Sequence, residues 1–451
     1  MGSPVAKTRK AACWIALACL VVPMFASYFF DDMFSTLSHL FKNPELLELG
    51  WDSAAYGFYA GGYSFLCVCG GLIVCGVLLD VFGVRLVGSI FVGLMVLGAG
   101  TVYTAISVGL PPSTSLAIAY VGCMLFGLGS EIAGVAVTRS IAKWFKGRNV
   151  ALAMGLQLAI ARLGTAAAFV LSPILVAQKA PGQMYTLAET GRPALLGLTL
   201  LLIGGILWAI FVAMDARFDR ERGVKTQRGA VAEEDKFKWS DIIKVLTNPR
   251  FIMIALLCVF FYCCIVSFKK FGTSIVIPRF GMDVDSAKWM ITMIPFFTVV
   301  FTPTFGALVD KVGKATTWMI IGAVLVLCAH LLLAFAPQGV PFWGYLGIAV
   351  LGVGYSLVPS AMWPSVPKII PEKNLGTAYS LIYWIQNMGL LLVPVFVGGI
   401  FKRQSSDVAA AVDAEYIFIG LAIVAIVVAL LLSFSSRRHP ELELDQPSIK
   451  K

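Results

Sequence analysis

Two opposite charges lie deep within apolar stretches of this sequence. Glu131 lies in "FGLGSEIAGVAV" and Arg162 in "GLQLAIARLGTAAAFVL", many residues from any polar flank. An arginine near the centre of a bilayer costs roughly 3 kcal/mol by insertion scales, so it needs a compensating role. Together, a carboxylate and a guanidinium can bind a small zwitterion: the carboxylate takes its ammonium, and the guanidinium takes its carboxylate through two parallel hydrogen bonds.

The sequence places both charges at one depth. A short basic turn, "KWFKGRN", joins the two stretches, which predicts antiparallel helices side by side. Glu131 precedes Trp144 by about 20 Å of helix, and Arg162 follows Gly147 by about 22 Å, at about 1.5 Å per residue. Both then lie near the middle of a core about 30 Å thick. A buried structural ion pair is the alternative, but ionisable residues within a membrane favour a functional role.

Polar and aromatic residues of other apolar stretches are candidates for lining the same cavity. They are Tyr63, Tyr262, Trp363, Tyr383, Trp384, Gln386 and Asn387. Aromatic faces offer apolar and cation–π contact to varied side chains. Each of the aromatic residues is alternatively a packing residue of its helix. No spacing of ligating or nucleophilic residues predicts a metal site, a cofactor or an enzyme, and no phosphate-binding loop occurs.

The composition indicates that this is a membrane protein, so these charges lie within membrane-spanning segments. The chain has 451 residues, of which 59% are hydrophobic and 13% charged, against about 25% charged in soluble proteins. Twelve apolar stretches reach spanning length, at residues 12–30, 54–79, 86–108, 115–142, 149–175, 194–214, 250–277, 286–308, 316–336, 342–366, 375–400 and 415–434. Because these stretches lack strand alternation, they predict an all-α integral membrane protein of twelve helices.

One long polar stretch, residues 215–248, separates six predicted spans from six. We predict an N-terminal bundle over 1–214, a linker over 215–248 with a short amphipathic helix at "WSDIIKVL", and a C-terminal bundle over 249–451. With both termini on one side, that side carries 24 of the 35 Lys and Arg residues, which predicts cytoplasmic termini. The basic excess forms no stripe with aromatic residues, so we expect no nucleic-acid partner.

The two halves repeat one another. Gly76, Asp80 and Gly83 in "GVLLDVFGVR" recur 230 residues later in "GALVDKVGK". Their counterparts are Gly306, Asp310 and Gly313. At an offset of 225, "FGLGS" recurs as "LGVGY", and "RNVALAMGLQLAIARLG" as "KNLGTAYSLIYWIQNMG". Internal repeats of this kind are typical of secondary transporters, whose substrate site lies near the midplane between the repeats.

The deep charges occur in one half only. At the offset of 225, Glu131 corresponds to Ser356 and Arg162 to Asn387. Charges that only supported the fold would be expected in both halves. The one-sided pair therefore favours recognition of a ligand with two opposite charges.

The glycine–aspartate–glycine loop resembles the signature loop of the major facilitator superfamily, and the resemblance extends over essentially the whole chain. It implies two pseudo-symmetric six-helix bundles with alternating access. It also implies that Gly76 allows close helix approach, that Asp80 contacts a helix N-terminus across the bundle interface, and that Arg85 pairs locally. Gly83 and Asp310 belong to the two copies of this loop. An ordinary helix cap is the alternative for Asp80.

Three further motifs resemble the lysosomal dipeptide uniporter group of that superfamily. They are "WFKG", "GLQLAIARLG" and "MWPSVPKIIPEKNLGTAYSLIYWIQNMGL". The resemblance implies dipeptide substrates whose amino and carboxy ends are held by residues that map onto Glu131 and Arg162. The chain has no Asn-x-Ser/Thr sequon and its N-terminus has no acidic dileucine signal, which favours a prokaryotic cytoplasmic membrane, with a lysosomal membrane expected if the chain is eukaryotic. No feature indicates an accessory membrane protein.

Uniport is the favoured mechanism because a neutral charge pair that carries a zwitterion leaves no net site charge to move. Asp31 and Asp32, at the outer end of the first span, are expected to be solvated. Lys269 and Lys270 are expected to snorkel to the interface, with guidance of carboxylates at an external gate as the alternative. An organic-anion exchanger would need two or more basic residues in the cavity. A transport-dead scaffold or receptor would need neither the repeat nor the charges.

Overall fold

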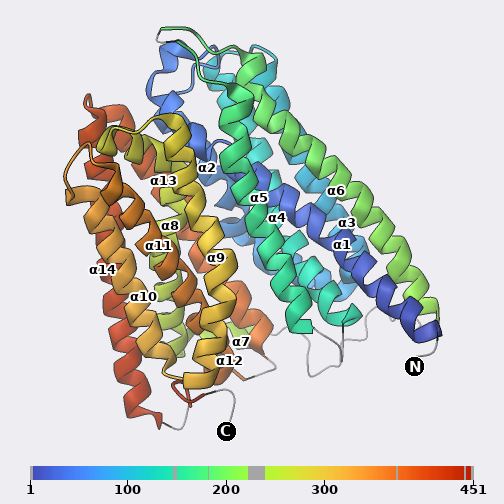
Figure 1. The fold of residues 1–451 in the computed structure, drawn as a ribbon. Coiled ribbons are helices and arrows are strands. Elements are labelled where there is room, and N and C mark those ends of the chain that lie inside the picture. The colour runs from blue at the N-terminus through green and yellow to red at the C-terminus, as the bar shows by residue number, and fades with distance from the viewer. Residues whose placement is uncertain are drawn as a thin grey trace.

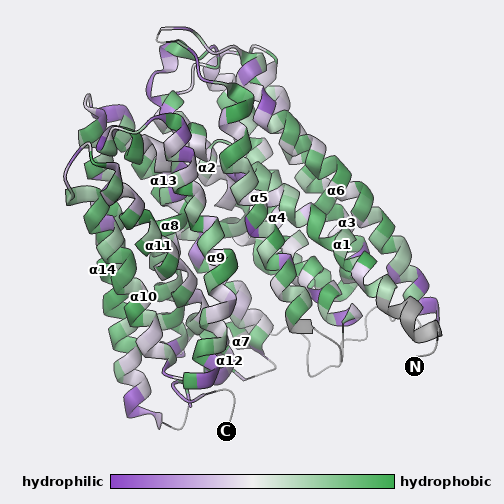
Figure 2. Ribbon diagram, viewed as in Figure 1, coloured by the Kyte–Doolittle hydropathy of each residue, from purple (hydrophilic) through white to green (hydrophobic). Residues whose placement is uncertain are grey.

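The computed structural model describes residues 4–145, 150–180, 182–221, 239–371, 374–440 and 443–447. Within these residues, twelve helices are long and apolar enough to cross a membrane. Hydrophobic residues make up most of the length of these helices, and many of the hydrophilic residues lie toward the helix ends (Figure 2). The chain is an all-α multi-pass membrane protein, which confirms the fold class that the apolar stretches predict.

Six spans form the N-terminal bundle. Its elements are α1 (Pro4–Asp32), η1 (Ser35–Lys42), η2 (Pro44–Leu46), α2 (Ser53–Leu66), the π-helical η3 (Cys67–Gly71), α3 (Leu72–Ser107), α4 (Pro112–Trp144), α5 (Val150–Val176) and α6 (Leu187–Glu221). α6 continues through residues 215–221, which the sequence assigned to the linker. The linker residues 222–238 lie outside the described part of the chain.

Six further spans form the C-terminal bundle. Its elements are α7 (Trp239–Leu246), α8 (Pro249–Phe280), α9 (Val284–Val312), α10 (Ala315–Phe335), α11 (Pro341–Met362), η5 (Trp363–Ser365), α12 (Val366–Ile369), α13 (Leu375–Arg403) and α14 (Asp407–Arg438). α7 is the short helix predicted at "WSDIIKVL", and it contacts α8 and α13.

The two copies of the repeated loop turn the chain at the same glycine. Gly83, with φ 79° and ψ 165°, interrupts α3 and separates the second span from the third. Its counterpart Gly313, with φ 71° and ψ −142°, ends α9. Both φ values lie in the region that favours glycine, so a side chain at either position would strain the turn.

Repeated glycines also fix equivalent helix contacts in each bundle. A Cβ atom on Gly164 of α5 would lie 2.3 Å from the Phe25 carbonyl oxygen of α1. A Cβ atom on its counterpart Gly389 of α13 would lie 2.3 Å from Sγ of Cys263 on α8. The fifth span therefore packs on the first as the eleventh packs on the seventh.

The two bundles meet at one end of the molecule and diverge toward the other (Figure 1). We call the end that carries both chain termini the terminal end, and the opposite end the distal end. Contacts between the bundles join η1 to α8, α2 to α13 and α5 to α9. The α2–α13 contact is tight, because a Cβ atom on Gly57 would lie 2.3 Å from the Pro394 carbonyl oxygen. Near the terminal end, a Cβ atom on Gly155 or Gly376 would meet no heavy atom within 4 Å.

We expect Gly164→Ala to destabilise the protein by about 1–3 kcal/mol, because the new methyl group would overlap the α1 backbone. Gly155→Ala is the matched control on the same helix, and it should leave stability unchanged or slightly raised, since alanine favours helix. Thermal unfolding of the purified variants in detergent, followed by tryptophan fluorescence, measures the difference. Equal midpoints for the two variants would contradict this packing.

Candidate functional site

Glu131 lies on α4 and faces α2 and the opposite bundle. The Tyr63 hydroxyl donates a hydrogen bond to Oε1 of Glu131 over 3.1 Å. The preceding residue, Ser130, lies 2.6 Å from the Ser27 hydroxyl of α1. The Glu131 carboxylate is also close enough to Tyr383 of α13 for an electrostatic interaction. A carboxylate in the membrane-spanning region therefore faces the interface between the bundles.

Arg162 lies on α5 between two tyrosine rings. Its Cζ atom lies 5.8 Å from the ring centroid of Tyr28 on α1 and 5.1 Å from that of Tyr355 on α11. Both distances suit cation–π attraction, which partly offsets the desolvation of the guanidinium. α11 belongs to the opposite bundle, so Arg162 also faces the interface. Within the described part of the chain, Glu131 and Arg162 form no ion pair with each other or with a third residue, which leaves both charges available to a ligand.

The helices that carry the two charges contact each other, as the short turn predicts, but only slightly, because α5 packs mainly on α1 and α9. α1 lies between them, with Ser27 bonded to Ser130 next to Glu131 and Tyr28 beside Arg162. Gly164 seats α5 on α1, so the turn joins the helix ends without forcing α4 and α5 to pack together. This spacing is why the alternative of a structural Glu131–Arg162 pair does not form.

Aromatic residues of the C-terminal bundle lead from one charge toward the other. We call Tyr355, Tyr262, Trp363 and Tyr383 the aromatic wall. Tyr262 lies 5.9 Å from Tyr355 and 6.5 Å from Trp363, as ring centroid distances. The Trp363 indole stacks on Tyr383 at 5.1 Å and donates from Nε1 to the Tyr262 hydroxyl over 3.1 Å. The wall starts beside Arg162 and ends near Glu131, and it includes three of the predicted site residues.

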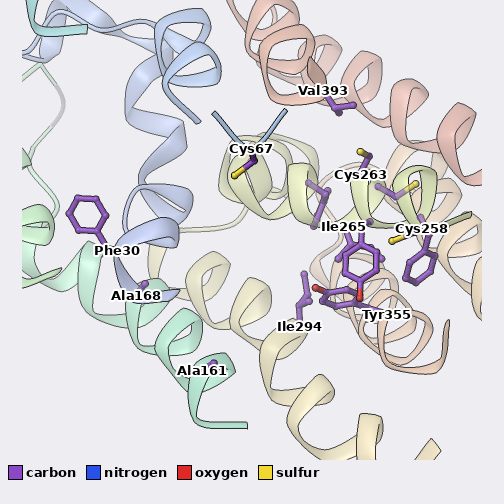
Figure 3. Packing of buried hydrophobic residues seen from close by; sticks show 14 of the residues in the cluster. Phe30, Cys67, Ala161, Ala168, Cys258, Cys263, Ile265, Ile294, Tyr355 and Val393 are labelled. Atoms are coloured by element: carbon purple, nitrogen blue, oxygen red, sulfur yellow. The ribbon is translucent and has the colours of Figure 1, made fainter. Parts of the chain in front are cut away.

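The other predicted polar residues of α13 contact residues of their own bundle. Gln386 accepts a hydrogen bond from Sγ of Cys258 over 3.6 Å, inside the C-terminal bundle. Buried Asn387 donates to the Tyr383 carbonyl over 3.0 Å, and its Oδ1 atom has no hydrogen-bond partner among the described residues. Trp384 instead joins the bundles, donating to the Val68 carbonyl in η3 over 2.7 Å. Figure 3 shows Tyr355 with Cys258 and other buried residues of both bundles.

The loop residues lie at the terminal end. Arg85 pairs with Asp215 of α6 at 3.0 Å and also contacts Asp219. Lys143 of α4 lies 2.8 Å from both carboxylates. These pairs all lie within the N-terminal bundle, in line with the local pairing that the resemblance implies for Arg85.

Among the remaining loop residues that the structure describes, Gly76 makes no close contact across the interface. A Cβ atom on Gly76 would lie 4.0 Å from the Ser380 hydroxyl of α13, which is ordinary packing distance. Asp310 is half-buried on α9, and the side chain of Asp80 lies outside the described residues. Nowhere in the described chain do three His, Cys, Asp or Glu residues gather as a metal site.

Two expectations about charged residues are wrong. Asp32 is 1% exposed rather than solvated, and Lys269 and Lys270 are 5% and 6% exposed rather than snorkelling. They pair with one another across the interface, Lys269 with Asp32 at 3.0 Å and Lys270 with Asp31 at 2.9 Å. The first span carries only the two acidic members of this group and the seventh span only the two basic ones, so hydropathy alone gave no reason to place these spans next to each other.

Sequence reasoning also missed Tyr28 and Tyr355, the two rings beside Arg162. The repeat could have pointed to Tyr355. At the offset of 225, Tyr355 corresponds to Ser130, which directly precedes the candidate site residue Glu131. Tyr28 follows Ser27 within an apolar span. This short polar interruption was the only feature of the sequence that could have marked Tyr28 as a candidate site residue.

The sequence also matches a known family and several named relatives. Residues 24–278 and 263–451 match the family model of the Major Facilitator Superfamily. The lysosomal dipeptide transporter MFSD1 of Danio rerio is 29% identical over 416 residues, covering 90% of this chain and 84% of that protein. The Homo sapiens protein of the same name is 27% identical over 425 residues, covering 91% of this chain and 82% of that protein.

Solved structures share the fold. The inward-open xylose transporter XylE from E. coli superposes with a TM-score of 0.69 at 13% identity, covering 94% of this chain and 96% of that one. A mutant of the peptide transporter POT gives a TM-score of 0.63 at 14% identity, covering 94% of this chain and 95% of that one.

We expect Trp363→Phe to lower the free energy of unfolding by about 0.5–1.5 kcal/mol, because it keeps a ring but removes the hydrogen bond to the buried Tyr262 hydroxyl. Trp289→Phe is the control, since Trp289 is 52% exposed. Denaturant titration of both variants in mixed micelles gives the difference. An unchanged Trp363→Phe variant would mean that the wall is held by ring packing alone.

Proposed function

Because the chain belongs to the Major Facilitator Superfamily, and is therefore a multi-pass transporter of a small molecule rather than an enzyme, we propose that it transports dipeptides. The relatives that are 27–29% identical over most of the chain are named lysosomal dipeptide transporters. The single observation that carries the proposal is the pair of opposite charges, Glu131 and Arg162, which form no ion pair within the described residues and face the bundle interface on either side of α1.

Each part of the site suits one part of a dipeptide. The ammonium end binds Glu131, whose carboxylate Tyr63 orients through its hydroxyl. The carboxylate end binds Arg162, whose planar guanidinium can donate two parallel hydrogen bonds. The aromatic wall supplies apolar and cation–π surface without demanding one side-chain type. Because the charges belong to one bundle and the wall to the other, a bound dipeptide contacts both bundles.

We expect Ala-Ala to raise the thermal midpoint of the purified protein. N-acetyl-Ala-Ala and Ala-Ala-amide, each lacking one terminal charge, should raise it far less. Removing one partner of a desolvated charge pair typically costs about 2–5 kcal/mol, so Glu131→Gln and Arg162→Gln should each weaken Ala-Ala binding by roughly 30-fold or more. Thermal-shift titration of all three ligands measures this.

Glu189→Gln and Arg192→Gln serve as matched charge controls, because Glu189 and Arg192 lie near the distal end of α6, away from Glu131 and Arg162. Both should keep the wild-type response. Shifts that survive in Glu131→Gln and Arg162→Gln would refute the site. A response to oxalate or phosphate esters in place of dipeptides would support an organic-anion exchanger. Binding without uptake into liposomes would favour a receptor or scaffold.

We infer uniport from the charge balance of the site. Glu131 and Arg162 sum to zero when empty, and a zwitterion adds no net charge, so neither state needs a proton to cross the membrane. In proteoliposomes with a pH-sensitive dye inside, dipeptide uptake should proceed without a proton flux. An imposed pH gradient should not drive accumulation above the external concentration. Uphill accumulation driven by the gradient would establish symport instead.

We place both termini in the cytoplasm, because the terminal side carries 24 of the 35 Lys and Arg residues. The distal end then faces the exterior or an organelle lumen. The chain contains no Asn-x-Ser/Thr sequon, which supports the cytoplasmic membrane of a prokaryote as its location. In a eukaryotic cell, the lysosomal membrane named for the relatives is the expected location.

A further inference from the structure

Four charged residues, three of them buried, join the bundles on the distal side of the proposed site. We call Asp31 and Asp32 of α1, with Lys269 and Lys270 of α8, the four-charge cluster. Lys269 lies 3.0 Å from Oδ2 of Asp32, and Lys270 lies 2.9 Å from Oδ1 of Asp31 and 3.2 Å from Oδ1 of Asp32. Each ion pair links one bundle to the other. The side chains are 2–7% exposed, except Asp31 at 29%.

Two more ion pairs across the interface lie farther toward the distal surface. Lys42 of η1 pairs with Asp407 at 3.2 Å, and Lys402 of α13 pairs with Asp52 at 2.9 Å. Burial alone raises the pKa of Asp52, but the hydrogen bond from the Ala55 N–H and the Lys402 ammonium outweigh it and lower that pKa. Asp52 therefore stays charged at neutral pH. These outer pairs are more exposed than the four-charge cluster and so are screened more strongly by salt.

We propose that the four-charge cluster is the distal gate of the transporter, which closes the route from the substrate site to the distal side. Opening that route requires α1 to separate from α8, which breaks all three ion pairs of the cluster at once. The proposal uses only the alternation of access that is part of the proposed function, and it does not depend on the substrate being a dipeptide.

The position of the cluster fits a gate that lies directly above the site. Asp31 and Asp32 follow Tyr28, the ring beside Arg162, by three and four residues, or about 5–6 Å of helix. The Tyr56 hydroxyl of α2 donates to the Lys270 carbonyl over 3.0 Å, which adds a further link between the bundles. A solute at Arg162 is thus one helical turn from the closed ion pairs.

Thr165 connects the gate to the substrate arginine. Its hydroxyl donates to Oδ2 of Asp32 over 2.8 Å, the same oxygen that pairs with Lys269. Thr165 follows Arg162 by three residues on α5, so the two side chains lie on one helix face. One turn farther, the Phe169 ring lies 5.9 Å from the Lys269 ammonium. Thr165 is a positioning residue, which fixes the Asp32 carboxylate for the gate.

A distance measurement across the distal end tests the gate without any substrate. Spin labels are placed at Gln178 of the N-terminal half and Gln338 of the C-terminal half, both exposed at the distal end. The exposed Cys69 and Cys328 are changed to serine in the full-length chain. In nanodiscs, the short distance should dominate. The double variant Lys269→Gln/Lys270→Gln should raise the ratio of long to short distances roughly tenfold or more, because two carboxylates lose their partners.

Three further variants separate a gate from a merely stabilising contact. The charge swap Asp32→Lys/Lys269→Asp should restore the short distance. Thr165→Val should lengthen it, and Thr165→Ser, which keeps the hydroxyl, should not. Glu189→Gln is the matched control, because Glu189 pairs with Lys179 at 2.6 Å at the same distal end but within the N-terminal bundle.

Wild-type distances in Lys269→Gln/Lys270→Gln would overturn the gate. If that variant does not fold, the charge swap decides, since a swapped pair that leaves the long distance dominant also overturns it. A responsive gate together with absent Ala-Ala binding would refute the proposed substrate and leave the gate standing. Distances that do not change in the variants, together with normal Ala-Ala binding, would refute the gate and leave the proposed substrate standing.

Discussion

The structure depends on keeping an unneutralised guanidinium in the middle of a membrane protein. Arg162 has no carboxylate partner in the described chain and is flanked by the rings of Tyr28 and Tyr355. Ring faces attract a cation but do not neutralise it, so the arginine remains able to bind an anion. One ring comes from each bundle. The cost of burying this charge is therefore shared by the interface that must move during transport.

α1 is the element that makes this arrangement possible. It separates the helices that carry the two charges, through Ser27 on one side and Tyr28 on the other. Had α4 and α5 packed directly, a Glu131–Arg162 ion pair would have satisfied both residues and closed the site to ligands. Gly164 lets α5 pack closely on the α1 backbone, and its repeat counterpart Gly389 lets α13 pack closely on α8. A packing requirement thus keeps the charges apart.

Sequence reasoning reached the features that depend on position along the chain. Twelve spans and their order follow from apolar length, and the repeated loop marked Gly83 and Gly313. It failed where the outcome depends on which helices are lateral neighbours. Hydropathy does not show which helices are neighbours, so Asp31 and Asp32 were predicted to be solvated, and Lys269 and Lys270 were predicted to snorkel to the interface. The first and seventh spans are counterparts in the repeat. Comparing their opposite charges would have predicted the ion pairs between them.

The same lateral arrangement places the proposed gate and the proposed site on the same helices. On α1, Tyr28 lies one turn before Asp32, and on α5, Arg162 lies one turn before Thr165, with Thr165 bonded to Asp32. Thr165 and Lys269 contact the same oxygen of Asp32, and Thr165 lies one helical turn from Arg162. If the proposed site and gate are both correct, a ligand that moves Arg162 toward the aromatic wall should also move Thr165, and with it the Asp32 oxygen that Lys269 binds. The arrangement therefore favours coupling between occupancy of the site and closure of the gate.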